Sequence, residues 1–338
     1  MVNILCSPIE QAYIPSRTNI TSLLLLDTNL TDVEFEMHNS KLEILTIIQS
    51  RLKRVPDSIK HLGLVKVIDF VRSRIEFVDL SVFCKLQRLQ ILNLMHNNIA
   101  FLNLSHVSGF AFASLKEIFL SHNLLTRISW DAFSIMKALR LLDISNNLIH
   151  CVDGVLLSSS LTNLELSGNR LTALSCCGWN LTSLTNFYLN NNTLEQLPDC
   201  MEETMPNLSY LGLASNQLSN DDDNIWNRLG ILLHLQMLDL SYNRLTSVVW
   251  YNISLSVRYM NIRNNRIQYM SIPMPKDGLN FDAGCTTIER FQVSSMSSND
   301  IYSNMYCIPM HCSWNSELMG YRNRFQCSRD GESCPMCV

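Results

Sequence analysis

A pattern of leucines returns along most of this chain and limits its fold more than any other feature. The segment LQILNLMHNNI starts at Leu89, and its leucine spacing, with an asparagine at the ninth place, recurs in LRLLDISNNLI from Leu139 and LQMLDLSYNRL from Leu235. Eleven such repeats, some of them weaker copies, begin 22 to 27 residues apart, at Ile20, Leu42, Val65, Leu89, Leu115, Leu139, Leu161, Leu184, Leu208, Leu235 and Val257. A period of this length is typical of solenoids, in which each repeat forms one coil.

The first seven places of each repeat predict a short strand whose leucines point into a shared core, with strands of consecutive repeats paired in parallel. The asparagine at the ninth place lies where the chain leaves the strand. Its amide can satisfy backbone groups that would otherwise be buried without a partner. The first three repeats have Thr28, Ser50 and Ser73 at that place, so we expect a less regular ladder there.

Over residues 20 to 270, these repeats resemble the leucine-rich-repeat family. The resemblance implies an α/β repeat fold, a leucine-rich-repeat solenoid (horseshoe) of about eleven repeats with a parallel concave sheet. The ends of a solenoid expose its core and need caps. We therefore predict an N-terminal cap segment at 1–19, the solenoid at 20–272 and a cysteine-rich C-terminal cap at 273–338.

Composition and cysteine usage favour a secreted protein. Six of the twelve cysteines follow residue 284, which suggests an oxidised framework. The net charge of -4 does not indicate nucleic-acid binding, and no apolar run is long enough to span a membrane. The first ten residues do not resemble a signal peptide, so we expect the signal to be absent from this chain. Seven N-x-S/T sequons, one of them at Asn191, add weak support for secretion, and we expect glycans at Asn19, Asn29, Asn103, Asn180, Asn207 and Asn252.

The cysteines of the middle repeats allow a specific prediction. Cys177 and Cys200 both occupy place 17 of consecutive repeats, where neighbouring coils lie about 5 Å apart. We predict a disulfide between them, and a second one between Cys151 and Cys176. Cys84 is expected to be a buried core residue. The C-terminal disulfide cysteines, whose connectivity is not readable, are Cys285, Cys307, Cys312, Cys327, Cys334 and Cys337. The alternative for the last five of these, with His311, is a zinc site.

Places three, five and seven of each repeat should point to the concave surface. The early repeats place there an apolar stripe made of Leu24, Leu26, Ile44, Ile48, Val67, Val71, Ile91, Met95 and Phe119. Later repeats add Tyr188, Tyr210 and Tyr259. Exposed apolar surface of this extent usually marks an interaction site. The opposing interpretation is that residues 1–19, or a segment preceding this chain, fold over the stripe and make it ordinary core.

No set of residues predicts catalysis, a cofactor or a metal site. Asp143 and Glu165 occupy place five of adjacent repeats, but aspartate there belongs to the repeat pattern itself. His96 and His122 share place eight, so we expect their imidazoles to be neighbours at the rim, where they could sense mild acidification. The acidic run at 221–223 is read as a solvated loop. We therefore expect a binding protein and not an enzyme.

The irregular early repeats, the vicinal Cys176 and Cys177 and the cysteine-rich end are similar to the secreted leucine-rich-repeat immune proteins of mosquitoes. That resemblance, to a short member without a coiled coil, implies a role in insect innate immunity. It also implies partners such as a complement-like thioester protein or another leucine-rich-repeat protein, and a disulfide-linked oligomer. The alternatives are an adhesion or receptor ectodomain module, or an intracellular scaffold with a zinc-bound C-terminal cap.

Overall fold

The computed structural model describes residues 1–39, 41–103, 112–220, 225–250, 256–273, 280–284, 286, 288, 290–294, 311–314 and 325–328. The chain forms two compact units, each made of leucine-rich coils. The first unit comprises Met1–Arg170 with Gly178–Ser183, and the second comprises Leu171–Cys177 with Leu184–Val338.

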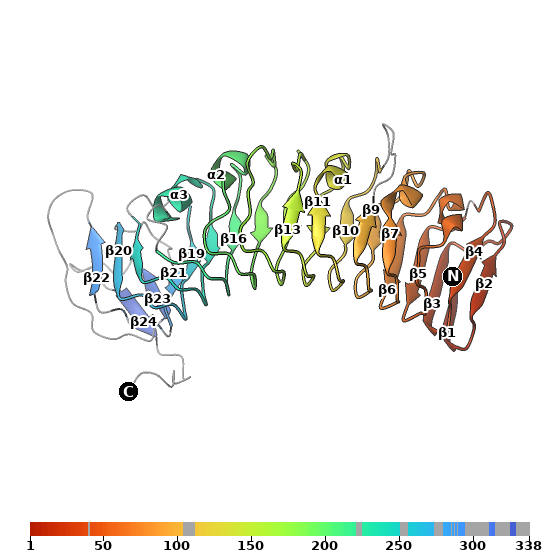
Figure 1. Ribbon diagram of the computed structural model, residues 1–338, viewed down its shortest axis with the longest axis horizontal. Coiled ribbons are helices and arrows are strands. Elements are labelled where there is room, and N and C mark those ends of the chain that lie inside the picture. Colours follow the sequence, from red (N-terminus) through yellow and green to blue (C-terminus); the bar gives the residue numbers. More distant parts are fainter. Residues whose placement is uncertain are drawn as a thin grey trace. The chain divides into compact units, whose positions relative to one another are not determined.

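The first unit contains a parallel sheet in which each coil contributes one strand, side by side in sequence order (Figure 1). Its strands are β1 (Val2–Ser7), β3 (Ser22–Thr28), β5 (Ile44–Ile48), β6 (Val67–Val71), β8 (Ile91–Asn93), β10 (Glu117–Phe119), β12 (Leu141–Asp143) and β14 (Asn163–Glu165). The opposite side of the coils carries short elements: β2 (Gln11–Ile14), β4 (Asp32–Phe35), η1 (Asp57–His61), β7 (Phe77–Asp79), η2 (Leu80–Phe83), β9 (Phe101–Asn103), β11 (Arg127–Ser129), α1 (Asp131–Ser134) and β13 (Cys151–Asp153).

The second unit repeats this arrangement. Its parallel strands are β15 (Asn186–Tyr188), β16 (Tyr210–Gly212), β17 (Met237–Asp239), β19 (Tyr259–Asn261) and β21 (Asn280–Asp282), followed by antiparallel β23 (His311–Trp314) and β24 (Phe325–Ser328). The other side carries α2 (Met201–Thr204), α3 (Ile225–Ile231), β18 (Ser247–Val249), β20 (Tyr269–Pro273) and β22 (Arg290–Ser294). The eleven predicted repeats supply β3 to β14 in the first unit and β15 to β19 in the second, so the solenoid prediction is confirmed.

Alternation along each strand builds the core. Leu23 and Leu25 are completely buried, whereas Leu24 and Leu26, which alternate with them along the strand, are only half-buried. Successive side chains of a strand point to opposite faces, so each coil contributes one set to the core and one set to the outer face of the sheet. We call the residues at places three, five and seven of the first unit, together with Asn3 and Leu5 of β1, the open face.

Asparagines at the ninth place hold consecutive coils together. The Asn123 side chain donates from Nδ2 to Leu120 O at 2.9 Å in its own coil and to Leu94 O at 3.0 Å in the preceding coil. Its Oδ1 accepts from the backbone N–H of Ile99 at 3.0 Å. In the early repeats the ladder is weaker, as predicted. Ser50 and Ser73 hydrogen-bond each other at 2.7 Å, and the buried Thr28 hydroxyl has no partner among the described residues.

Every repeat turns at place eight through a left-handed backbone conformation, which the sequence analysis did not anticipate. The residues with positive φ at this place are Asp27, Gln49, Arg72, His96, His122, Asn146, Gly168, Asn191, Ser215, Tyr242 and Asn264. Only Gly168 escapes the steric cost that a Cβ carries there. We call this line of place-eight residues the rim.

Residues 1–14 extend the ladder of coils at its N-terminal end. β1 pairs in parallel with β3 from Val2 with Leu23 to Ser7 with Thr28, and β2 pairs in parallel with β4. The segment therefore continues the ladder by one strand instead of folding across the open face.

Candidate functional site

The apolar residues of the open face form two rows and not one continuous stripe. At place seven the register aligns Leu5, Leu26, Ile48 and Val71, and Met95 follows because its carbonyl accepts from Arg72 N. At place three it aligns Ile44, Val67 and Ile91. We call these two sets the apolar rows. Leu5 and Ile44 are exposed, at 54% and 40%, and the other side chains of the rows are half-buried.

The pairing of β1 with β3 and of β2 with β4 contradicts the interpretation that residues 1–19 fold over the stripe. Nothing in the described part of the chain buries either apolar row. Leu5 was not among the predicted residues, because it precedes the first recognisable repeat, but it occupies the same place on β1 as Leu26 does on β3.

A polar line separates the apolar rows. Thr46, at place five, donates to Asp69 Oδ2 at 3.1 Å, and Asn93 is a further hydrogen-bond partner of Asp69. Burial raises the pKa of Asp69, while these two hydrogen bonds oppose the increase. Leu24 and Phe119 stand at the two ends of this line. The site is thus an apolar surface with a hydrogen-bonded polar centre.

Carboxylates follow directly after Phe119. The register pairs Phe119 with Asp143 and Asp143 with Glu165, as their shared place predicts. One oxygen of each carboxylate is used locally: Asp143 Oδ1 accepts from Ser145 N at 3.0 Å, and Glu165 Oε1 accepts from Ser167 N at 2.9 Å. Burial raises the pKa of Glu165, and the negative charge of Asp143 adds to the increase.

His96 and His122 meet at the rim, as expected from their shared place. Their rings stack with centroids 4.2 Å apart and planes within 8°. Burial lowers the pKa of His96, and the positive charges of His122 and Arg72 lower it further.

The predicted tyrosines lie in the second unit. Tyr188 and Tyr210 pack against each other with ring centroids 4.8 Å apart. Gly212 makes this packing feasible, because a Cβ there would lie 3.0 Å or less from Asn190 and Tyr210 side-chain atoms. Tyr259 does not join the pair, since β17 lies between β16 and β19. Burial raises the pKa of Tyr259, with further contributions from Asp282 and Asp239.

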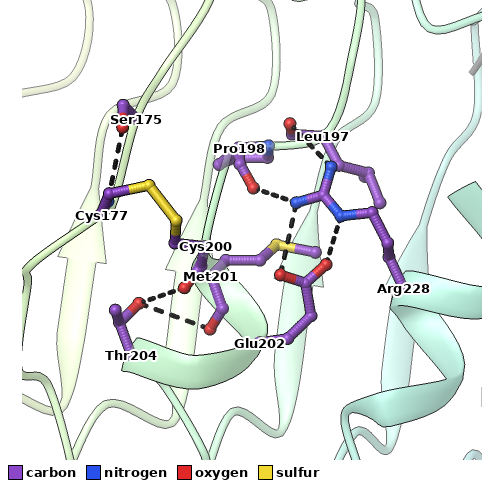
Figure 2. Close-up of a disulfide and its surroundings, with 9 residues drawn as sticks. All are labelled: Ser175, Cys177, Leu197, Pro198, Cys200, Met201, Glu202, Thr204 and Arg228. Carbon is purple, nitrogen blue, oxygen red and sulfur yellow. Dashed lines mark hydrogen bonds and ion pairs between the residues drawn. A yellow bond between two sulfur atoms is a disulfide. The ribbon is translucent and has the colours of Figure 1, made fainter. Parts of the chain in front are cut away.

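The structure confirms the predicted bond between Cys177 and Cys200, with Cα atoms 4.9 Å apart (Figure 2). Nearby, the guanidinium of Arg228 on α3 bonds the Glu202 carboxylate and the carbonyls of Leu197 and Pro198. This ion pair is largely buried, with side chains 17% and 10% exposed. Disulfide and ion pair therefore fasten the segment between β15 and β16 from two sides.

The predicted bond between Cys151 and Cys176 is wrong, because both thiols are free. Cys176 is completely buried, whereas Cys151 lies on β13 beside Arg127 and Asp153. The two cysteines occupy different places in their repeats, 13 and 16, so the coil spacing does not bring them together. Cys84 is free and half-buried, not fully buried as expected.

Most of the predicted C-terminal disulfide cysteines lie outside the described residues. Cys285, Cys307, Cys334 and Cys337 lie there, and Cys312 and Cys327 are described only by backbone register, which makes them Cα partners across β23 and β24. Their disulfides, like the zinc alternative, therefore stay predictions. Elsewhere in the described chain, no group of three or more His, Cys, Asp or Glu side chains is arranged to hold a metal ion.

The predicted glycan acceptors avoid the open face. Asn19, Asn103, Asn180 and Asn207 are exposed and Asn29 is half-buried, whereas Asn252 lies outside the described residues. None of them occupies place three, five or seven of a repeat. Glycans at these positions would leave the apolar rows accessible.

The helices within the described ranges are all too short or too polar to cross a bilayer.

Comparison with known proteins agrees with this architecture. A leucine rich repeat model matches residues 98–149 and 113–171, and a second one matches residues 234–254. Tsukushi of Xenopus tropicalis is 34% identical over 164 residues, which cover 46% of this chain and 44% of that protein. Lumican of Oryctolagus cuniculus is 30% identical over 186 residues, covering 54% of this chain and 91% of that sequence.

Among solved structures, YopM from Yersinia enterocolitica WA-314 superposes with a TM-score of 0.55 at 22% identity, covering 86% of this chain and 58% of that one. This likeness concerns the fold alone. The chain spans less than half of the length of the first curated relatives it matches. Repeat pattern, coil architecture and relatives agree that the chain belongs to the leucine-rich-repeat family.

Proposed function

We propose that this chain is a non-enzymatic extracellular recognition protein that binds a protein partner through the open face of its first unit. One observation carries the proposal: the apolar rows are partly exposed, most strongly at Leu5 and Ile44, and no described segment covers them. Leaving side chains such as Leu5, Ile44 and Ile48 partly exposed costs solubility, so a group of apolar side chains of this extent on a protein surface usually marks an interface. The hydrogen-bonded polar line between the rows would orient a partner.

The test is a pair of matched double variants. I48D/V71D places two charges in one apolar row, whereas F77D/F101D places two charges on the opposite side of the first unit, where Phe77 and Phe101 are exposed. Each protein is immobilised and incubated with extracellular fluid of its source, and retained proteins are identified by mass spectrometry. We expect a protein retained by wild type and F77D/F101D but lost from I48D/V71D. Equal retention by both variants would refute the proposal, and circular dichroism checks that each variant folds.

Extracellular location is supported by relatives such as lumican and Tsukushi, by the sequons and by the disulfide. Its test is the intact mass of the protein from its native source before and after reduction and deglycosylation. A secreted chain should lose glycan mass and gain the mass of two hydrogens for each disulfide reduced. An unglycosylated chain with every thiol free would instead support an intracellular scaffold.

Within this function, we propose a role in insect innate immunity, with a complement-like thioester protein or another leucine-rich-repeat protein as the partner. The support is the resemblance carried by the irregular early repeats and the scattered cysteines. The exposed free thiol of Cys6 is compatible with a disulfide-linked oligomer. The same retention experiment identifies the partner, and a doubled mass without reductant would reveal the linked oligomer.

A further inference from the structure

The charges of the open face are all of one sign. Its carboxylates are Asp69, Glu117, Asp143 and Glu165, and no lysine or arginine stands at places three, five or seven of β3 to β14 or at their equivalents on β1. Arg72, on the rim, lies beside the stacked histidines, where its charge lowers the pKa of His96. A face of this kind repels phosphate backbones and anionic lipids and attracts cations.

The carboxylates adjoin the apolar rows. Glu117 is the register partner of Ile91, and Asp143 is the partner of Phe119, so each lies one strand spacing, about 4.8 Å, from an apolar side chain. Glu165 continues the same line by one more strand. A single bound segment could therefore contact both kinds of surface at once.

The carboxylate pair has no internal counter-charge. Asp143 and Glu165 accept hydrogen bonds only from Ser145 and Ser167, which are neutral, and neither forms an ion pair within the described chain. Two partly buried like charges in adjacent coils repel each other, and a cation from outside would remove that repulsion.

We propose that the open face selects a protein segment that combines apolar side chains with a lysine or arginine, and that Asp143 and Glu165 receive this cation. The inference rests on the proposed function and specifies the chemistry of its partner. The apolar side chains would lie on the apolar rows near Phe119, and the cation would lie beyond them over β12 and β14.

The test uses a random twelve-residue peptide library displayed on phage and panned against the complete chain. We expect enriched peptides to combine apolar residues with at least one Lys or Arg. One enriched peptide is then synthesised, together with a version in which Leu replaces its cation. Binding of both peptides is measured to wild type, to D143N/E165Q and to the control E76Q/D153N. The D143N/E165Q substitutions keep the oxygens that accept from Ser145 and Ser167, so they change charge with little change in shape.

For the cationic peptide, D143N/E165Q should weaken binding about tenfold or more, whereas E76Q/D153N should not. The Leu version should bind wild type and D143N/E165Q alike. Enriched peptides without cations, or unchanged affinity for D143N/E165Q, would overturn this inference and leave the proposed function standing. Peptides that bind I48D/V71D with the same affinity as wild type would refute both this inference and the proposed function. If phosphatidylserine vesicles or a single-stranded oligonucleotide bound to this face more strongly than the cationic peptide does, the inference would also be overturned.

Discussion

The rings of His96 and His122 stack in parallel at the rim, 4.2 Å apart, although they come from coils separated by 26 residues in sequence. Parallel stacking suits neutral imidazoles, since two protonated rings at this distance would repel. Arg72, at the rim position before His96, adds a permanent positive charge.

Acidification should weaken the fold through His96. Its pKa in the folded chain lies below the usual 6.5, so the unfolded chain binds more protons between these two values. Stability therefore falls as the pH drops through that window. H96N removes the titrating group and tolerates the left-handed backbone. We expect its free energy of unfolding, measured in urea between about pH 5 and pH 8, to depend less on pH than that of wild type. An unchanged slope would contradict this prediction.

Glu165 should change the pH dependence of stability in the opposite direction to His96. Its folded-state pKa is raised above the usual 4.5, so the folded chain binds more protons in the window above that value. Stability therefore falls as pH rises through the window. The stability of wild type relative to E165Q should increase on acidification, measured by urea unfolding of both proteins. D143N should reduce this effect because it removes the neighbouring charge. A difference that does not vary with pH would count against the assignment.

Removing the disulfide should destabilise the second unit. Cys177 and Cys200 are 23 residues apart, and closing a loop of this length stabilises a fold by about 3 kcal/mol in the chain-entropy model. We expect C177S/C200S to lower the free energy of unfolding by about that amount. C6S, which replaces an exposed free cysteine, serves as the control and should change it by less than about 0.5 kcal/mol. Equal midpoints for the two variants in urea would argue against the prediction.

The ion pair between Arg228 and Glu202 should show strong coupling. R228M leaves a largely buried carboxylate without its cation, which typically costs about 3 kcal/mol or more. R228M/E202L removes both charges, and we expect it to recover much of that loss, because apolar replacement of a buried pair is often close to neutral. Urea unfolding of the single and double variants completes the cycle. If the losses of unfolding free energy in R228M and in E202L add up to the loss in R228M/E202L, the two side chains are not coupled.

The repeat period predicted most of the architecture, because it fixes at once which residues enter the core and which strands are neighbours. It therefore also predicted the bond between Cys177 and Cys200 and the meeting of His96 with His122, since each pair shares a place. It could not find Leu5, because β1 lies before the first repeat with recognisable leucine spacing. It also failed for Cys151 and Cys176, whose places differ, so that proximity in repeat number did not mean proximity in space.

The rim shows a different limit of pattern analysis. The consensus identifies core leucines and the ladder asparagine but leaves place eight undefined, so its left-handed backbone was not expected. The polar line through Thr46, Asp69 and Asn93 was overlooked for a related reason. It depends on which side chains stand beside one another at a single place, and a search for leucine spacing ignores that information.

The left-handed turns of the rim offer a route to engineering. A side chain other than glycine or asparagine in that conformation typically costs about 1 kcal/mol. This chain accepts the cost at positions as varied as Gln49, Arg72, Ser215 and Tyr242. A variant with glycine or asparagine at each of them should resist heat better than wild type, but it would lose the different side chains that the rim now presents. Comparison of this variant with wild type in stability and in partner binding would show which of these side chains matter for more than the fold.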